Sequence, residues 1–169
     1  MELIYKKAEL RDIDILTETR IDVLRAANQL TADEDMSEVG EVREKSYTYY
    51  ERALNSNTHT AYLVYDRNTV VGAGGVSFFQ VMPTWHNPSG NKAYIMNMYT
   101  HPDYRRKGVA FKVLDMLVKE CRERNITAIS LEATAMGRPL YEKYGFVKME
   151  HEMELPENTG VEEEIEDGQ

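Results

Sequence analysis

The sequence predicts a mixed α/β fold, and three observations support that class. The chain has 169 residues, near the usual size of one domain, and 42% of them are hydrophobic, which is enough for one core. Segments with apolar residues at helical spacing alternate with short segments rich in β-branched and aromatic residues. Their order is β α α β β β α β α β. We therefore expect one domain over residues 1–155, followed by a tail at 156–169.

The first half of the chain contains two helical patterns between strand-like segments. Asp12 and Ser37 stand where these helices would begin, and both are residue types that cap helix N-termini. A polar turn at 66–68 separates two β-rich segments and predicts a hairpin. The elements expected here are a strand at 3–8, helices at 13–27 and 37–53, and hairpin strands at 60–65 and 70–79.

The second half begins with a loop at 82–91, in which two prolines and a glycine interrupt regular structure. Beyond this loop the expected elements are strands at 93–100, 127–132 and 146–155 and helices at 107–124 and 138–144. Cys121 falls on the apolar stripe of the helix at 107–124, so we expect it to face the core. A buried thiol is unreactive, which argues against catalysis by this cysteine.

Charge and composition exclude several classes of protein. The formal net charge is −9, and residues 157–169 carry six acidic side chains with no Lys or Arg, so we expect this tail to be disordered. The remainder is only mildly acidic, which argues against general nucleic-acid binding. No apolar run reaches the roughly 20 residues that span a membrane, and a single cysteine excludes intrachain disulfides and paired-cysteine metal sites. These features predict a soluble cytoplasmic protein that binds neither membrane nor metal.

The segment Arg105-Arg106-Lys107-Gly108-Val109-Ala110 leads directly into the predicted helix at 107–124. The first backbone N–H groups of a helix have no intrahelical partner, and the helix dipole is positive there, so a diphosphate can bind them. Gly108 lacks a Cβ and would allow phosphate oxygens to approach the backbone. The alternative is that basic residues merely precede a helix and that the glycine eases the turn. The local chemistry does not decide between the two.

Two blocks of sequence together resemble one family. Arg105-x-x-Gly108-x-Ala110 is similar to the [RQ]-x-x-G-x-[GA] acetyl-CoA signature of the GNAT superfamily of N-acetyltransferases. The block Pro139-Leu140-Tyr141-Glu142-Lys143-Tyr144-Gly145-Phe146 resembles the late segment of that family, in which a helix bearing a tyrosine ends at a Gly-Phe pair. Finding both blocks in order is more specific than finding either alone.

The resemblance implies a central, mostly antiparallel mixed sheet that is flanked by helices and splayed between its fourth and fifth strands. Acetyl-CoA, as co-substrate and without a metal, would lie in the opening. The pantetheine arm would pair with the backbone of Met98, Tyr99 and Thr100, and Arg105 would belong to the same site. The pyrophosphate would lie on the segment that comprises Arg106, Lys107, Gly108, Val109, Ala110 and Phe111.

The resemblance also implies direct attack of a neutral amine on the thioester, with Tyr141 as the general acid that protonates the leaving thiolate. A phenol suits this role because its reference pKa is about 10, so it stays protonated at neutral pH. The alternative is that Tyr141 packs in the core. Tyr144, in the same block, is interpreted as a packing residue or as a contact near the cofactor.

The general base does not carry over from the family. Some members place a glutamate early in the fourth strand, where this chain has Tyr94. Glu132, at the end of the fifth predicted strand, is the substitute we expect, although a strand-end glutamate can also be a solvated charge. His86 is the other candidate, since an unperturbed histidine titrates near pH 6.5. Trp85 and His86 are also candidate substrate-binding residues, or simply parts of a surface loop.

The acceptor is not identified by the sequence. It is an amine of a small molecule or of a protein, and a second copy of the chain, in a homodimer, is a further candidate partner. Two other functions remain open: a catalytically inactive acyl-CoA sensor or interaction module, which the missing strand glutamate would favour, and a transferase for a different acyl group.

Overall fold

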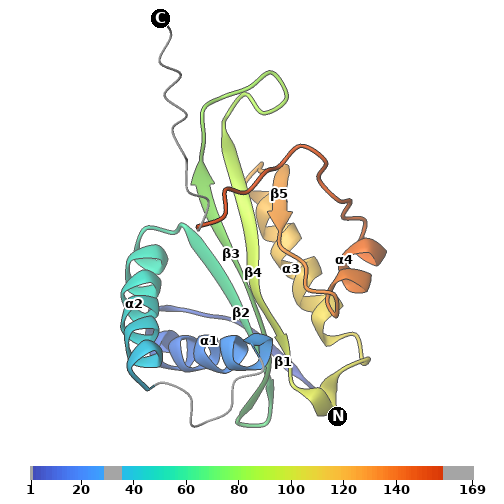
Figure 1. Ribbon diagram of the computed structural model, residues 1–169. Coiled ribbons are helices and arrows are strands. Elements are labelled where there is room, and N and C mark those ends of the chain that lie inside the picture. The colour runs from blue at the N-terminus through green and yellow to red at the C-terminus, as the bar shows by residue number, and fades with distance from the viewer. Residues whose placement is uncertain (1, 29–35, 158–169) are drawn as a thin grey trace, which may run out of the picture.

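The computed structural model describes residues 2–28 and 36–157 and confirms the predicted mixed α/β class (Figure 1). Most of the expected helices and strands are present within a few residues of their expected bounds. In chain order they are β1 (Ile4–Lys7), α1 (Ile13–Asn28), α2 (Met36–Asn55), β2 (His59–Asp66), β3 (Thr69–Gln80), β4 (Asn91–Thr100), α3 (Val109–Glu123), β5 (Ala128–Leu131) and α4 (Arg138–Tyr144). Short 3₁₀ turns precede α1 and α3, at Leu10–Asp12 and Pro102–Tyr104.

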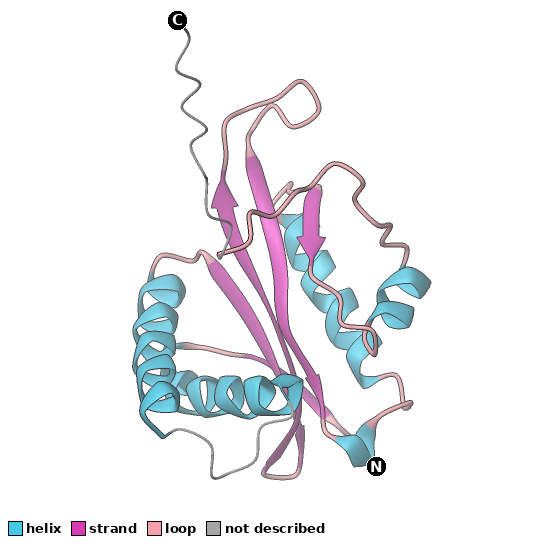
Figure 2. Cartoon of the chain, viewed as in Figure 1, coloured by secondary structure: helices cyan, strands magenta, loops and turns pink. Residues whose placement is uncertain are grey.

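The described strands form one sheet in the order β1-β2-β3-β4-β5, as Figure 2 shows. Neighbouring strands from β1 to β4 are antiparallel, whereas β4 and β5 are parallel. A parallel pair requires a crossover connection, which α3 supplies. The prediction of a mostly antiparallel mixed sheet is therefore confirmed.

Helices cover both faces of the sheet. On β2, Leu63 and Val64 are both fully buried but point to opposite faces, because side chains alternate along a strand. Leu63 belongs to a core shared with α1 and α2, and Val64 to a core shared with α3. The predicted stripe of α3 lies in the second core, where Cys121 is fully buried and burial raises the pKa of its thiol to about 11. The expectation of a core-facing cysteine is therefore confirmed.

The predicted strand at 146–155 is wrong, because this segment forms no strand in the structure. Its apolar residues alternate with charged ones, which is the pattern of a strand with one buried face. Val147 and Met153 are nevertheless 85% and 98% exposed, and the segment crosses the sheet without joining it (Figure 1). Periodicity cannot supply a neighbouring strand, and a strand needs one to satisfy its backbone groups.

The helix caps also differ from expectation. The Asp12 carboxylate does not cap α1. It accepts a hydrogen bond from the Glu9 backbone N–H at 2.8 Å and one from Lys6 Nζ at 2.6 Å, within the turn that precedes the helix. Ser37 lies inside α2, which the structure describes from Met36 onward. The predicted tail at 156–169 falls almost entirely outside the described residues. No helix in the described part of the chain is long and apolar enough to cross a membrane.

A buried polar network at the start of β2 links α2 to the sheet. The His59 side chain is 4% exposed, and its Nδ1 lies 2.9 Å from the Tyr49 hydroxyl and 3.2 Å from the Ser77 hydroxyl. The two hydroxyls are 2.6 Å apart. Burial lowers the pKa of His59 from 6.5 to about 4, so the imidazole is neutral in the folded protein at pH 7.

This network predicts a pH-dependent loss of stability. Between pH 6.5 and pH 4 the unfolded chain binds a proton at His59 and the folded chain does not, so stability falls as the pH falls. We expect the wild type to lose about 2–3 kcal/mol more than His59→Phe between pH 7 and pH 4.5, by urea unfolding at both values. Acid-sensitive carboxylates titrate in both proteins and cancel in the comparison. Equal losses would show that His59 is not held neutral by burial.

Candidate functional site

The sheet opens between β4 and β5. The two strands pair only along Lys92–Ile95 and Ala128–Leu131, and β4 then continues to Thr100 with β3 as its only partner among the described strands. The edge of β4 that faces away from β3 is therefore open from Met96 onward. This confirms the expected splay, and Met98, Tyr99 and Thr100 lie along this open part of the strand.

A β-bulge marks the point where the opening begins. Gly75 pairs with Met96 and Ala73 pairs with Tyr99, so Asn97 and Met98 lie opposite the single residue Gly74. Asn97 takes up the extra length with a φ of 58°, a left-handed conformation that asparagine tolerates better than most residues. A bulge bends its strand and interrupts the regular pairing, so the direction of β4 changes at the edge of the opening.

The N-terminus of α3 lies after the end of β4 and presents free backbone donors. Gly108 precedes the helix with a φ of 80°, and Arg106 also has a positive φ of 58°. Within the described residues, the backbone N–H groups of 106–111 donate no well-formed hydrogen bond. Apart from its chain neighbours, no atom of the described residues lies within 4 Å of the position that a Cβ on Gly108 would occupy. The arrangement provides consecutive amides, a positive helix end and space for an anion.

The basic side chains of this segment do more than add charge. Arg105 Nε donates to the Thr100 carbonyl at 3.1 Å, and Lys107 Nζ donates to the Asp103 carbonyl at 2.8 Å. The first bond ties the turn to the end of β4, and the second stabilises the turn internally. The sequence predicted Arg105 and Lys107 as part of the cofactor site, and in the structure their side chains also stabilise the turn.

Tyr141 lies on α4 and is 8% exposed. Its ring packs edge-on against Phe146, with the ring centres 6.1 Å apart, and burial raises the pKa of its hydroxyl. No described residue accepts or donates a hydrogen bond at this hydroxyl. The phenol is therefore protonated at neutral pH and retains its proton for donation.

Tyr144, one turn later on α4, has a different environment. Its hydroxyl donates to Asp115 Oδ1 on α3 at 3.0 Å, and its ring lies 5.4 Å from that of Phe111. Tyr144 thus joins α4 to α3 and has a structural role. The two tyrosines differ in whether their hydroxyl already has a partner.

Glu132 follows β5 and is exposed. Burial, and then the negative charge of Glu132, raise the pKa of the Tyr94 hydroxyl on β4. Glu132 therefore lies beside the position where the family resemblance expects a glutamate. The carboxylate of Glu132, at the end of β5, thus lies beside Tyr94, the residue that this chain has where some family members have a glutamate.

Trp85 and His86 lie in the loop that joins β3 to β4, at the opposite end of β4 from Thr100 (Figure 1). Both are exposed, and Trp85 is 98% exposed. The structure does not bring them together with Tyr141 or with the start of α3. Their predicted role in substrate binding remains a prediction.

Sequence reasoning missed one residue near the bulge, Arg20. Its Nη1 donates to Asn97 Oδ1 at 3.1 Å, which joins α1 to β4. A signal was present, because Arg20 interrupts the apolar stripe of α1 that continues through Leu16 and Val23. A charged residue on the sheet-facing side of a helix is a reason to look for a function.

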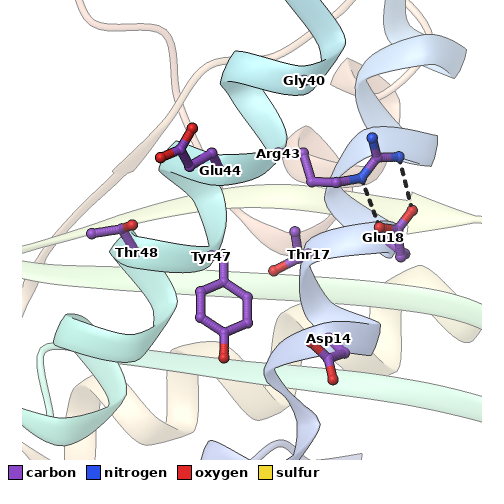
Figure 3. Close-up of a pocket in the computed structure, with 8 residues that line it drawn as sticks. All are labelled: Asp14, Thr17, Glu18, Gly40, Arg43, Glu44, Tyr47 and Thr48. Carbon is purple, nitrogen blue, oxygen red and sulfur yellow. Dashed lines mark hydrogen bonds and ion pairs between the residues drawn. The ribbon is translucent and has the colours of Figure 1, made fainter.

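A hollow also lies between α1 and α2 (Figure 3). On its rim, Arg43 pairs with Glu18 through Nε and Nη2 at 2.7 and 3.1 Å. The side chains that line it are Asp14, Thr17, Glu18, Arg43, Glu44, Tyr47 and Thr48, together with Gly40. This hollow therefore lies between the two helices.

The fold and site define a class: an α/β protein whose sheet opens between its parallel strands beside a free helix N-terminus. Residues 26–146 match the model of a protein family described as the acetyltransferase (GNAT) family. That match spans most of the chain, so the protein belongs to the GNAT acetyltransferase family. Acyl transfer from acetyl-CoA is the general activity that this family and fold support.

Solved structures agree with this assignment. A predicted acetyltransferase with acetyl-CoA from Clostridium acetobutylicum is 33% identical, with a TM-score of 0.82, over 92% of this chain and 96% of that one. A GCN5-related N-acetyltransferase from Ralstonia eutropha JMP134 is 20% identical with a TM-score of 0.78, over 92% of this chain and 98% of that one. The second comparison shows likeness of fold alone.

A shorter match occurs among curated proteins. The human Cysteine-rich protein 2-binding protein is 31% identical over 65 residues, which are 38% of this chain. The matched part is only 8% of the length of that protein. The mouse protein of the same name matches over the same length.

Proposed function

We propose that this protein is an N-acetyltransferase that transfers the acetyl group of acetyl-CoA to a primary amine. One observation carries the proposal: the open edge of β4 from Met96 to Thr100 leads to the free amides of residues 106–111. A strand edge can pair with an extended amide-containing arm, and a helix N-terminus binds phosphates. The pantetheine arm of CoA would thus pair with the edge of β4, and its phosphates would bind the amides at the start of α3.

In the proposed reaction the amine attacks the thioester carbonyl directly, and no acyl-enzyme forms. The C–N bond forms as the C–S bond breaks, so the amine must lose a proton and the thiolate must gain one. Tyr141 supplies the second proton, because its buried phenol is protonated and has no hydrogen-bond partner among the described residues. Cys121 takes no part, since it is fully buried on the core-facing side of α3.

Glu132 is the proposed base for the first proton, acting directly or through water. Glu132→Gln preserves the shape of the side chain and removes its basicity, so we expect kcat to fall about 10-fold. The effect is modest because Glu132 is exposed and solvent can replace it in part. The measurement is the pH profile of turnover, with Glu123→Gln, an exposed carboxylate on α3, as the control. An unchanged rate and acid limb in Glu132→Gln would remove Glu132 from the mechanism.

The proposal is tested by following free-thiol release from acetyl-CoA in the presence of a panel of amines. We expect release that depends on the amine, together with N-acetylated product. Acetyl-CoA binding with no release for any amine would favour an acyl-CoA sensor. Faster turnover of succinyl-CoA or propionyl-CoA in direct competition would favour a transferase of another acyl group.

A further inference from the structure

We infer that Arg20 anchors an anionic group of the acceptor, so that the substrate is an amine that also carries a carboxylate or phosphate. This inference rests on the proposed function. Three observations support the inference. Arg20 lies on the sheet-facing side of α1, it makes a single hydrogen bond to the bulge, and it has no carboxylate partner among the described residues.

A charged side chain at the position of Arg20 carries a cost in solvation. Along the sheet-facing side of α1, Leu16 and Val23 are 1% and 8% exposed, and Arg20 lies on the same side between them. Arg20 itself is only half-buried. Removing a guanidinium from water is costly unless its hydrogen bonds and charge are compensated. A leucine or isoleucine would continue the apolar stripe without that cost.

The hydrogen bonds and charges around the Arg20 guanidinium compensate this cost only in part. Nη1 of Arg20 donates to the neutral side chain of Asn97, and no carboxylate of the described residues lies within ion-pairing distance of the guanidinium. A guanidinium carries five N–H donors in a planar fork that fits a carboxylate or phosphate. Arg43, by contrast, directs two such donors at Glu18. Arg20 therefore keeps donors and charge available for a ligand.

The location of Arg20 is also suited to binding an acceptor. Asn97 forms the bulge at the beginning of the β4–β5 opening, so Arg20 lies beside the start of that opening. α1 packs on the sheet face opposite α3, whose N-terminus is the proposed phosphate site. The Arg20 guanidinium therefore lies on the opposite face of the sheet from that phosphate site. An acceptor bound to Arg20 through an anionic group would be held next to the open edge of β4.

The test uses acceptors in matched pairs: L-alanine with L-alaninamide for a carboxylate, and O-phosphoethanolamine with ethanolamine for a phosphate. We expect the wild type to prefer the anionic member of at least one pair in kcat/KM, and the preferred pair identifies the anion. Arg20→Gln should lower kcat/KM for that anionic acceptor about 10- to 100-fold, the range for hydrogen bonds to charged groups. It should leave the neutral amine nearly unchanged. Arg25→Gln, which removes the same charge from the same helix, controls for net charge.

Asn97→Asp provides a second variant that keeps the shape of the bulge. Aspartate also tolerates a positive φ, and its carboxylate would pair with the Arg20 guanidinium and occupy it. We expect Asn97→Asp to abolish the preference for the anionic acceptor, as Arg20→Gln does. Equal losses for anionic and neutral acceptors in both variants would show that the pair only shapes the bulge, and would overturn the inference.

A binding measurement separates this inference from the proposed function. Calorimetry on the CoA-saturated protein with the same four compounds needs no turnover. If no amine is acetylated, the proposed function fails, but binding of an anionic member that Arg20→Gln abolishes would still support the anchor. If no anionic member binds more tightly than its neutral partner and none is preferred in turnover, the anchor is wrong.

Discussion

Tyr141→Phe is expected to lower kcat roughly 100-fold, within the range for a lost general acid. The variant removes one oxygen and keeps the ring, so the packing against Phe146 and the fold should persist. If the hydroxyl acts mainly in the transition state, the affinity for acetyl-CoA should be nearly unchanged. The measurements are kcat on a confirmed amine and the dissociation constant of acetyl-CoA by calorimetry.

Tyr144→Phe is the matched control for this result. It also removes a phenol oxygen from α4, but that oxygen already donates to Asp115, so its loss should affect stability more than chemistry. We expect kcat within about twofold of wild type, because no proton transfer is assigned to Tyr144. If Tyr141→Phe turns over at the wild-type rate with chemistry rate-limiting, the acid is another group or solvent. Tyr141 would then be a packing residue.

Gly108→Glu is expected to weaken acetyl-CoA binding by at least about 100-fold, a change of roughly 2.7 kcal/mol. The introduced carboxylate side chain would stand before the free amides of residues 106–111 and would place a negative charge where the pyrophosphate is expected. Its Cβ would clash with nothing in the described part of the chain, since beyond the adjacent residues no atom there lies within 4 Å of that position. The loss should therefore come from the ligand site and not from a clash within the fold.

Gly108→Ala separates two effects of the Glu substitution: obstruction of the phosphate site by the side chain, and backbone strain at a left-handed position. The φ of 80° at Gly108 is left-handed, so any residue with a Cβ loses about 1–2 kcal/mol of stability there, and Ala and Glu share that cost. We expect Gly108→Ala to lose less affinity than Gly108→Glu at similar stability, measured by thermal unfolding and calorimetry. Unchanged affinity in a folded Gly108→Glu variant would move the phosphate site elsewhere.

Local sequence patterns predicted the elements whose signals depend on their own residues. The stripe of α3 was predictable because Val113, Leu117 and Cys121 recur at helical spacing and all face one core. The segment before Gly108 was predictable as an anion site because free amides are a property of any helix start. The resemblance to the family supplied the opening between β4 and β5, which no local pattern in either strand encodes.

Features that depend on a partner elsewhere in the chain were not predictable. The alternation at 146–155 predicted a strand, but the pattern does not say whether a neighbouring strand is available. Asp12 has the residue type of a helix cap, yet its carboxylate accepts hydrogen bonds from Lys6 and from the Glu9 backbone instead. The bond between Arg20 and Asn97 joins residues 77 positions apart, so it appears only when α1 is packed on the sheet.

The central claim is that acetyl transfer occurs directly, with acetyl-CoA in the β4–β5 opening and the amine beside it. Initial rates at varied acetyl-CoA and varied amine test this most directly. Direct attack requires both substrates to be bound at once, so we predict double-reciprocal lines that intersect. Parallel lines would indicate an acetyl-enzyme formed before the amine binds, which would contradict direct transfer and the exclusion of Cys121 from catalysis.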